Sequence, residues 1–226
     1  MNPDFAIVLN FKLKSAKDVD ADFLVKTARN IGARAVSVDA HQTDFKKACA
    51  KYTIALVDGE TIQESCDLVP GDPIAKLVAN RKDGQNTIIN IPVTDNGKLP
   101  SETEAMLKQI NNWMHLFGHA FNESEPCALK ISNVEDNNGF VLQNRHMPYQ
   151  KYIFIKQPLP ETLKILGLSD NPNRIEMIEN RTELDFTFTD NELSINLKDV
   201  PESDFTWQLI RIQEHRPEDD IKETKY

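Results

Sequence analysis

Hydrophobic and polar positions follow two different periods along the chain. In the first half, short apolar runs alternate with stretches in which apolar residues recur every three or four positions. The runs predict buried strands and the stretches predict amphipathic helices. Strands are expected at 6–11, 33–38, 53–57 and 87–91, and helices at 20–31, 43–51, 73–81 and 101–117. Strands separated by helices predict a parallel sheet with right-handed crossovers.

The helix expected at 101–117 has the most regular pattern. Ser101 and Glu104 have the spacing of a capping box, which satisfies two backbone donors at a helix start. One apolar stripe runs along it, made of Met106, Leu107, Ile110, Trp113, Met114 and Phe117. Gly118 is expected to end this helix, as Gly32 is expected to end the helix at 20–31.

After residue 126 the helical period is replaced by alternation with a period of two. The alternating segments lie at 184–189, 193–197 and 205–209, and further strands are expected at 152–155 and 174–178. Asp190 and Asn191 form a turn signal between two of them. We therefore predict a first domain at 1–121, a polar junction at 122–126, an antiparallel β-sandwich at 127–213 and a frayed, charged tail at 214–226.

Charge and composition narrow the classes of molecule that this chain is expected to bind. It has 226 residues and a formal net charge of −9, which disfavours nucleic acids and anionic membranes. No apolar stretch reaches the roughly 20 residues of a membrane helix, and the start shows no secretory signal.

The cysteines, Cys49, Cys66 and Cys127, are far apart and form no C-x-x-C pair, so a thiolate zinc site is not expected. Buried free thiols in the cytoplasm are the simplest interpretation.

Three segments, taken together, resemble the α-L-fucosidases of glycoside hydrolase family 29. The first, 32–45, is similar to a family strand that ends in Lys-His-His-Asp-Gly-Phe. The second, 86–121, is similar to the last barrel strand, its Asp/Gly turn and the following helix. The third, 159–212, is similar to the C-terminal sandwich. The three segments occur in the same order as in the family, and the resemblance extends over roughly two-thirds of the chain.

The resemblance implies a (β/α)₈-like barrel, a β-sandwich and retaining hydrolysis of α-L-fucosides. A closed barrel needs about 250 residues, twice what lies before the junction, so its middle is expected to be missing. In the family, that middle carries the nucleophilic Asp in a Trp-rich motif, which neither Trp113 nor Trp207 marks. The expected fold class is α/β plus all-β: an abbreviated TIM-barrel-like domain followed by an antiparallel β-sandwich.

Polar residues that follow predicted strands are the candidate site residues. Asn10, Asp39, His41 and Asp58 stand at strand ends, which meet at one rim of a parallel sheet. The resemblance implies that His41 contacts sugar, because it matches the first His of the family motif, whereas Gln42 and Thr43 replace its second His and its Asp. The first strand ends in Asn10-Phe11 where the family has His-Trp, and Asn10 is a second candidate ligand contact.

Asp39 and Asp58 are the candidate catalytic acids. On neighbouring strands they could approach the roughly 5–9 Å separation of paired glycosidase carboxylates. The alternative interpretation is that both acids cap the loops or helices that follow. Both interpretations stay open at this point.

No metal site and no cofactor is expected. His115 and His119 have the i, i+4 spacing that lets two imidazoles share a metal on a helix. No third ligand is apparent, and Gly118 is expected to interrupt the helix between them, so a solvated pair is the preferred interpretation. Asp95, Asn96 and Gly97 look like a calcium-loop fragment, but a tight turn explains them.

The leading functional hypothesis is a fucosidase-like protein without fucosidase activity that acts as a carbohydrate-binding or regulatory module. Two alternatives remain: a residual glycoside hydrolase that uses Asp39 and Asp58, and a structural oligomerisation module with no ligand. An abbreviated barrel exposes sheet edges and an apolar interior face. A homodimer that covers this opened face is therefore expected.

Overall fold

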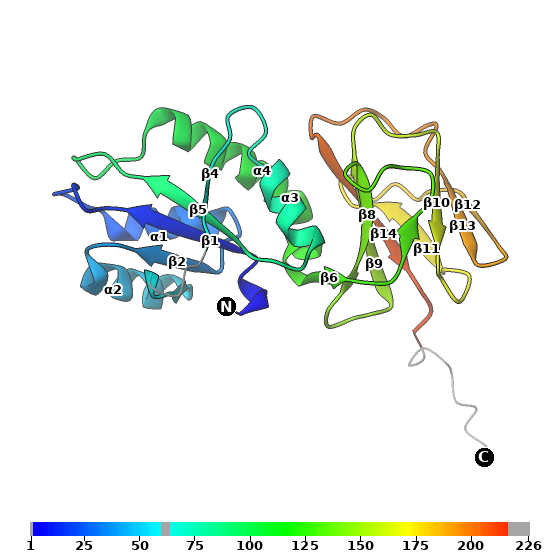
Figure 1. The fold of residues 1–226 in the computed structure, drawn as a ribbon, viewed down its shortest axis with the longest axis horizontal. Coiled ribbons are helices and arrows are strands. Elements are labelled where there is room, and N and C mark those ends of the chain that lie inside the picture. Colours follow the sequence, from blue (N-terminus) through cyan, green and yellow to red (C-terminus); the bar gives the residue numbers. More distant parts are fainter. Residues whose placement is uncertain (1, 60–63, 217–226) are drawn as a thin grey trace, which may run out of the picture. The chain divides into compact units, whose positions relative to one another are not determined.

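The computed structural model describes residues 2–59 and 64–216, which form two compact units, Met1–Asn122 and Glu123–Tyr226 (Figure 1). The division falls inside the predicted polar junction at 122–126. Most of the predicted tail, 217–226, lies outside the described residues. Within the described ranges, no helix combines the length and the apolar character that crossing a membrane requires.

A five-stranded parallel sheet forms the centre of the first unit, with the strand order β3-β2-β1-β5-β4. The strands are β1 (Ile7–Lys12), β2 (Ala35–Val38), β3 (Ala55–Leu56), β4 (Cys66–Asp67) and β5 (Thr87–Pro92). The predicted strands and their parallel pairing are confirmed, except that β4 was not predicted. The sheet is open, with β3 and β4 at its edges, so the described residues do not close a barrel.

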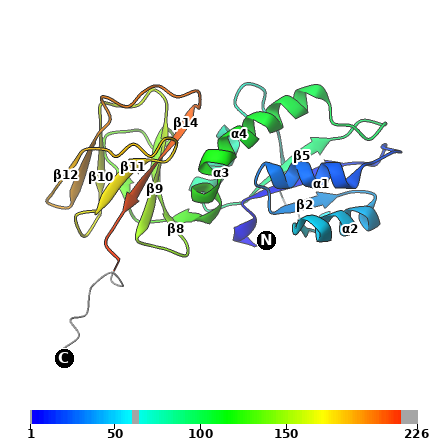
Figure 2. The same cartoon turned by 180° about the vertical axis from the view of Figure 1, so that it is seen from behind.

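After η1 (Pro3–Phe5), which precedes β1, the helices of this unit alternate with the strands. They are α1 (Ala21–Asn30), α2 (Gln42–Tyr52), α3 (Ala75–Lys82) and α4 (Ser101–Glu123). The connections β1–α1–β2, β2–α2–β3 and β4–α3–β5 each move one strand in the same direction across the sheet. Right-handed connections therefore place these three helices on one face. Helix α1 lies behind β1 in Figure 1 and in front of it in Figure 2, seen from the opposite side.

Alternate residues of β1 divide between the two faces of the sheet. Phe11 packs against Phe45 of α2, with ring centroids 5.8 Å apart, so Phe11 lies on the helix-covered face. Val8 points to the other face, where it forms a buried cluster with Ala35 and Ile88. Phe5, Ala55 and Val57 of the same chain pack against that cluster. This stretch of the face opposite α1, α2 and α3 is therefore buried within one chain. The homodimer stays a prediction.

Helix α1 begins and ends as its sequence predicts. The Asp20 carboxylate caps its start and accepts a hydrogen bond of 2.9 Å from the Phe23 amide. Gly32 follows its end with φ = 81°, a left-handed conformation that costs glycine least. A Cβ at Gly32 would also lie 2.7 Å from Cε of Met114. Gly32 therefore serves both the turn and a close approach to α4.

Helix α4 is longer than predicted, and the expectation that Gly118 ends it is wrong. The helix continues to Glu123 because Ala120 and Phe121 extend its apolar face, and the Phe121 ring lies 5.5 Å from that of Trp113. Gly118 fits inside the helix, where a Cβ would come within 3.2 Å of Met114 Cε. The predicted cap is also displaced by one residue: Ser101 is already helical, and Pro100 precedes the helix.

The second unit consists of two antiparallel sheets, with the orders β12-β13-β10-β7 and β11-β14-β9-β8-β6. Every pairing between the named strands in it is antiparallel. The strands are β6 (Ser124–Pro126), β7 (Lys130–Ile131), β8 (Gly139–Asn144), β9 (Gln150–Lys156), β10 (Thr162–Leu166), β11 (Arg174–Met177), β12 (Phe186–Thr189), β13 (Glu192–Asn196) and β14 (Trp207–Gln213).

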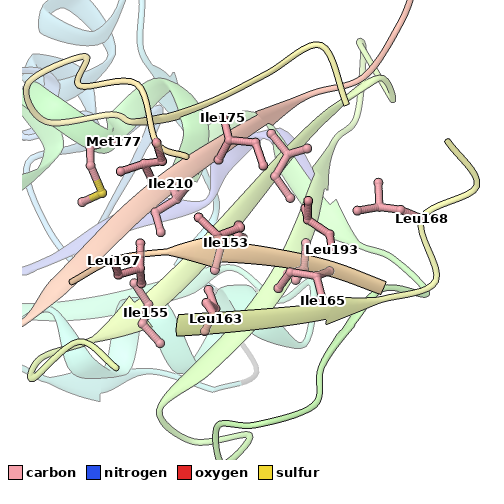
Figure 3. Packing of buried hydrophobic residues seen from close by; sticks show 14 residues of the cluster. Ile153, Ile155, Leu163, Ile165, Leu168, Ile175, Met177, Leu193, Leu197 and Ile210 are labelled. Atoms are coloured by element: carbon pink, nitrogen blue, oxygen red, sulfur yellow. The ribbon is translucent and has the colours of Figure 1, made fainter. Parts of the chain in front are cut away.

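The two sheets share one hydrophobic core, which makes the arrangement sandwich-like. Figure 3 shows Ile153 and Ile210 of one sheet and Leu163 and Leu193 of the other directed into the same cluster. Phe186 and Phe188 pack at its margin. Leu184, Leu193, Ile195 and Leu197 of the alternating segments lie in this cluster, but Trp207 and Leu209 do not, and β14 contributes Ile210 and Ile212 to it instead.

The turn at Asp190 and Asn191 is also confirmed. These residues have φ values of 51° and 62°, and they join β12 to β13. Positive φ at both central positions is the mark of the mirror-image type I turn, which suits the twist of paired strands.

Candidate functional site

Asn10 is the predicted site residue with the most informative surroundings. It lies in β1 and is buried. Its side chain points to the face opposite α1, α2 and α3, as that of Val8 does. Its Nδ2 donates a hydrogen bond of 2.9 Å to Oδ1 of Asn90. Asn90 occupies the directly paired position on β5.

The same level of the sheet carries polar residues on four adjacent strands. Ser37 of β2 pairs with Asn10, and Asp67 of β4 pairs with Asn90. Asn90 Nδ2 donates a hydrogen bond of 3.1 Å to Oδ1 of Asp67. We call Ser37, Asn10, Asn90 and Asp67 the polar row. The register of a parallel sheet places these four side chains next to one another on one face.

Burial changes steadily along the polar row. Ser37 is fully buried and Asn10 is 6% exposed, whereas Asn90 is half-buried and Asp67 is exposed. The hydrogen bonds run in one direction, from the Asn10 amide through Asn90 to the Asp67 carboxylate, and aligned bonds of this kind strengthen each other. The buried end differs, because the Ser37 hydroxyl has no hydrogen-bond partner among the described residues.

A pocket opens at the exposed end of the row. It has a volume of about 430 Å³ and lies where β1, β4 and β5 end and α4 begins. We call it the strand-end pocket. Its wall is formed by Lys12, Asp67, Leu68, Pro70, Asn90, Pro92, Glu102, Thr103 and Met106. The arrowheads of β1 and β5 point to this common edge in Figure 1.

The wall of the strand-end pocket combines opposite charges with apolar surface. Lys12, Asp67 and Glu102 are all exposed, so an ammonium group and two carboxylates can reach a bound molecule. Asn90 adds an amide with donors and an acceptor. Pro70, Pro92 and Met106 supply apolar patches. Such a wall can bind a small polar molecule that has both hydroxyl groups and C–H surface.

Asp39 and His41 hold the connection between β1 and α1. Oδ1 of Asp39 accepts a hydrogen bond of 2.6 Å from the backbone amide of Leu13. Nε2 of His41 lies 3.1 Å from the carbonyl oxygen of Ala16, and His41 has a left-handed backbone with φ = 58°. Neither side chain is part of the wall of the strand-end pocket. These contacts agree with the capping interpretation of Asp39.

Asp58 lies two residues beyond β3, which forms the opposite edge of the sheet from β4. It is exposed, and it too is absent from the pocket wall. The structure thus brings Asn10 towards the pocket through Asn90 and leaves the other predicted residues elsewhere on the rim. The roles predicted for Asp39, Asp58 and His41 stay predictions.

The sequence interpretation missed Ser37, Asp67 and Asn90. One signal could have found two of them: Ser37 and Asn90 interrupt otherwise apolar strands, as Asn10 does. Asp67 gave no such signal, because β4 has only two residues and the segment before it is not apolar. Only the strand order brings it beside Asn90.

Of the three cysteines, Cys49 is buried, whereas Cys66 and Cys127 are half-buried. All three are free in the structure. Burial raises the pKa of the Cys49 thiol to about 11, and burial is also the main cause of the raised pKa values of Cys66 and Cys127. The thiol rather than the reactive thiolate is therefore favoured at neutral pH. Among the residues that the structure describes, no group of three or more His, Cys, Asp or Glu side chains could hold a metal ion.

Known structures with a similar fold are α-fucosidases. The Thermotoga maritima α-fucosidase in complex with fucose matches with a TM-score of 0.53 and 14% identity, over 85% of this chain and 56% of that one. The α-L-fucosidase GH29 of Bacteroides thetaiotaomicron matches with a TM-score of 0.53 and 13% identity, over 91% and 42%. Isoenzyme 1 of Paenibacillus thiaminolyticus matches with a TM-score of 0.52 and 15% identity, over 63% and 34%.

The chain thus spans between about a third and somewhat more than half of the length of these enzymes. No protein-family model and no curated protein matches its sequence. The TM-scores of 0.52–0.53 establish similarity of fold, and at identities of 13–15% this similarity assigns no activity. The chain has a fucosidase-like fold.

Proposed function

We propose that this protein binds a neutral, hydroxyl-rich ligand of monosaccharide size in the strand-end pocket and does not hydrolyse it. One observation carries the proposal: the hydrogen-bonded line from Asn10 through Asn90 to Asp67 ends in the wall of a pocket of about 430 Å³. Polar residues held in order inside a sheet are positioned before a ligand arrives, which lowers the entropy cost of binding.

The chemistry of the wall supports a sugar. Hydroxyl groups donate to carboxylates and amides and accept from ammonium groups, and Asp67, Asn90 and Lys12 offer all of these. The C–H face of a pyranose needs apolar contact, which Pro92 and Met106 offer. The volume falls within the roughly 300–1,000 Å³ of small-molecule pockets.

We further infer that the parallel sheet is an arc of a (β/α)₈ barrel. Three crossovers step in the same direction across the sheet, which is the connection pattern of a barrel. In barrels, ligands bind at the carboxyl ends of the strands, where the strand-end pocket lies. The fucosidase-like fold favours a sugar at this place.

The proposed lack of hydrolysis rests on how the carboxylates are used. A retaining glycosidase needs two carboxyl groups about 5–5.5 Å apart at the scissile bond. Asp67 is hydrogen-bonded to Asn90, and Asp39 is hydrogen-bonded to the Leu13 amide. Asp58 lies beyond the opposite edge of the sheet from Asp67. Glu102 is the second carboxylate in the pocket wall, and we propose that Asp67, which is hydrogen-bonded to Asn90, does not form a catalytic pair with it or with Asp39 or Asp58.

The test is a binding and activity comparison on the whole chain. Thermal stability should rise with millimolar L-fucose or related monosaccharides, because a ligand that binds the folded state stabilises it. Asn90→Ala and Asp67→Asn should each abolish this rise. Asn111→Ala and Asp95→Asn are matched controls on the same unit, and they should keep the full rise.

The same preparations decide between the remaining alternatives. Release of chromophore from an aryl α-L-fucoside by the wild type, lost in Asp39→Asn and Asp58→Asn, would establish the residual hydrolase instead. No stabilisation by any sugar, together with a dimeric mass in light scattering, would support the oligomerisation module. A regulatory role and the homodimer remain proposals until these outcomes are known.

A further inference from the structure

Helix α4 carries two histidines whose setting differs from the one that their sequence suggested. His115 and His119 are both exposed, and α4 runs through both of them to Glu123. Gly118, which was expected to break the helix between them, is an ordinary helical residue here. The two side chains therefore occupy consecutive turns of one regular helix face.

The spacing of this pair matches the geometry of a chelate. Residues four apart on a helix have Cβ atoms about 5–6 Å apart, so two imidazole rings can direct one nitrogen each to a common ion. In the described part of the chain, neither ring takes part in a hydrogen bond or an ion pair that would compete for its nitrogens. We propose that His115 and His119 form a binding site for a divalent first-row transition-metal ion.

The ligand set indicates which ions the site would take. Imidazole suits copper, nickel and zinc, whereas magnesium and calcium prefer oxygen ligands. The described residues offer no third His, Cys, Asp or Glu side chain to complete a larger group. The protein supplies two nitrogens, and water fills the other positions. Such a site is open and exchangeable, with copper bound most tightly of these ions.

Metal binding at this place would act on α4 itself. The two ligands lie on either side of Gly118, and a glycine within a helix weakens it relative to alanine. An ion held by both rings fixes the residues around that glycine in helical geometry. The first turn of α4 contributes Glu102 and Thr103 to the strand-end pocket, so the clamped helix also borders the proposed sugar site.

The experiment titrates nickel chloride or zinc chloride into the whole chain in a buffer that does not bind metals, with calorimetry and thermal unfolding as readouts. The wild type should bind one ion per chain and unfold at a higher temperature, and magnesium chloride should have no effect. His115→Gln and His119→Gln should each weaken binding at least about tenfold, because even changes to residues that only support metal ligands cost about that much affinity.

His146→Gln is the control, since His146 is an exposed histidine that is ion-paired to Glu123. It should bind metal as the wild type does. The proposal is overturned if the wild type binds no transition metal, if both single variants keep wild-type affinity, or if His146→Gln loses as much affinity as they do. Sugar binding has no part in this readout, so the two proposals fail independently.

Discussion

The two faces of the parallel sheet differ in chemistry although the same strands build both. On the helix-covered face, Ile7, Leu9 and Phe11 of β1 are apolar and fully buried. On the other face, Val8 is followed by Asn10, and the neighbouring strands are polar at the same level. Val8 sits in an apolar cluster one level away, so apolar residues can pack on this face. The fold alone therefore does not require the polar row.

This difference has an energetic meaning. Burying a polar group costs free energy unless it is hydrogen-bonded, and a buried amide pair only offsets that cost. Asn10 donates to Asn90, which donates to Asp67, but among the described residues the buried Ser37 hydroxyl has no partner. Positions where a side chain conflicts with its buried surroundings are where function is expected. Mutations on the two faces can test this contrast.

The largest effect is expected on the helix-covered face. Phe11→Ala should lower the free energy of unfolding by about 3–5 kcal/mol, because it leaves a cavity beside Phe45. Urea denaturation measures this loss. Phe23→Ala is the control, since Phe23 is 46% exposed on α1 and should lose far less. Equal losses in both variants would contradict the assignment of Phe11 to the core.

A smaller effect is expected inside the polar row. Asn10→Leu keeps the size of the side chain but removes the donor to Asn90, so unfolding should become easier by about 1–3 kcal/mol. Urea denaturation of this variant beside Asn111→Leu, at a half-buried surface position, gives the comparison. An unchanged or higher stability would mean that the row is not maintained by its own hydrogen bonds.

The smallest effect, and the only gain, is expected at the buried end of the row. Ser37→Ala removes a hydroxyl that has no partner within residues 2–59 and 64–216, so stability should stay constant or rise by up to about 1 kcal/mol. The thermal unfolding midpoint is a sufficient measure. A loss above that size would show that a bound molecule satisfies the hydroxyl, which would extend the ligand site to β2.

Much of the fold was predictable because local patterns decide it. The apolar spacing of 20–31, with Gly32 after it, predicted α1 to within one residue at each end, and the structure adds Asp20 as its N-cap. The positive φ values at Asp190 and Asn191 followed from residue types that tolerate them. These features depend on contacts between residues that are near in sequence.

The errors have a common cause in long-range packing. Gly118 signals a helix end by propensity, but contacts of Phe121 with Trp113 carry α4 past it. The two-residue strand β4 has no pattern of its own and exists because β5 pairs with it. The hydrogen bond that the Asp39 carboxylate accepts from the Leu13 amide is another contact that only the fold reveals, and the catalytic role of Asp39 stays a prediction.

The sequence by itself determined the alternation of strands and helices in the first unit, the alternating strands of the second, and Asn10 as a polar residue at a strand end. Only the tertiary structure decided that Asn10 stands between Ser37 and Asn90, and that Asp67 completes the row. The physical reason is that side-chain period is a local property, whereas strand order and register are set by packing between segments far apart in the chain.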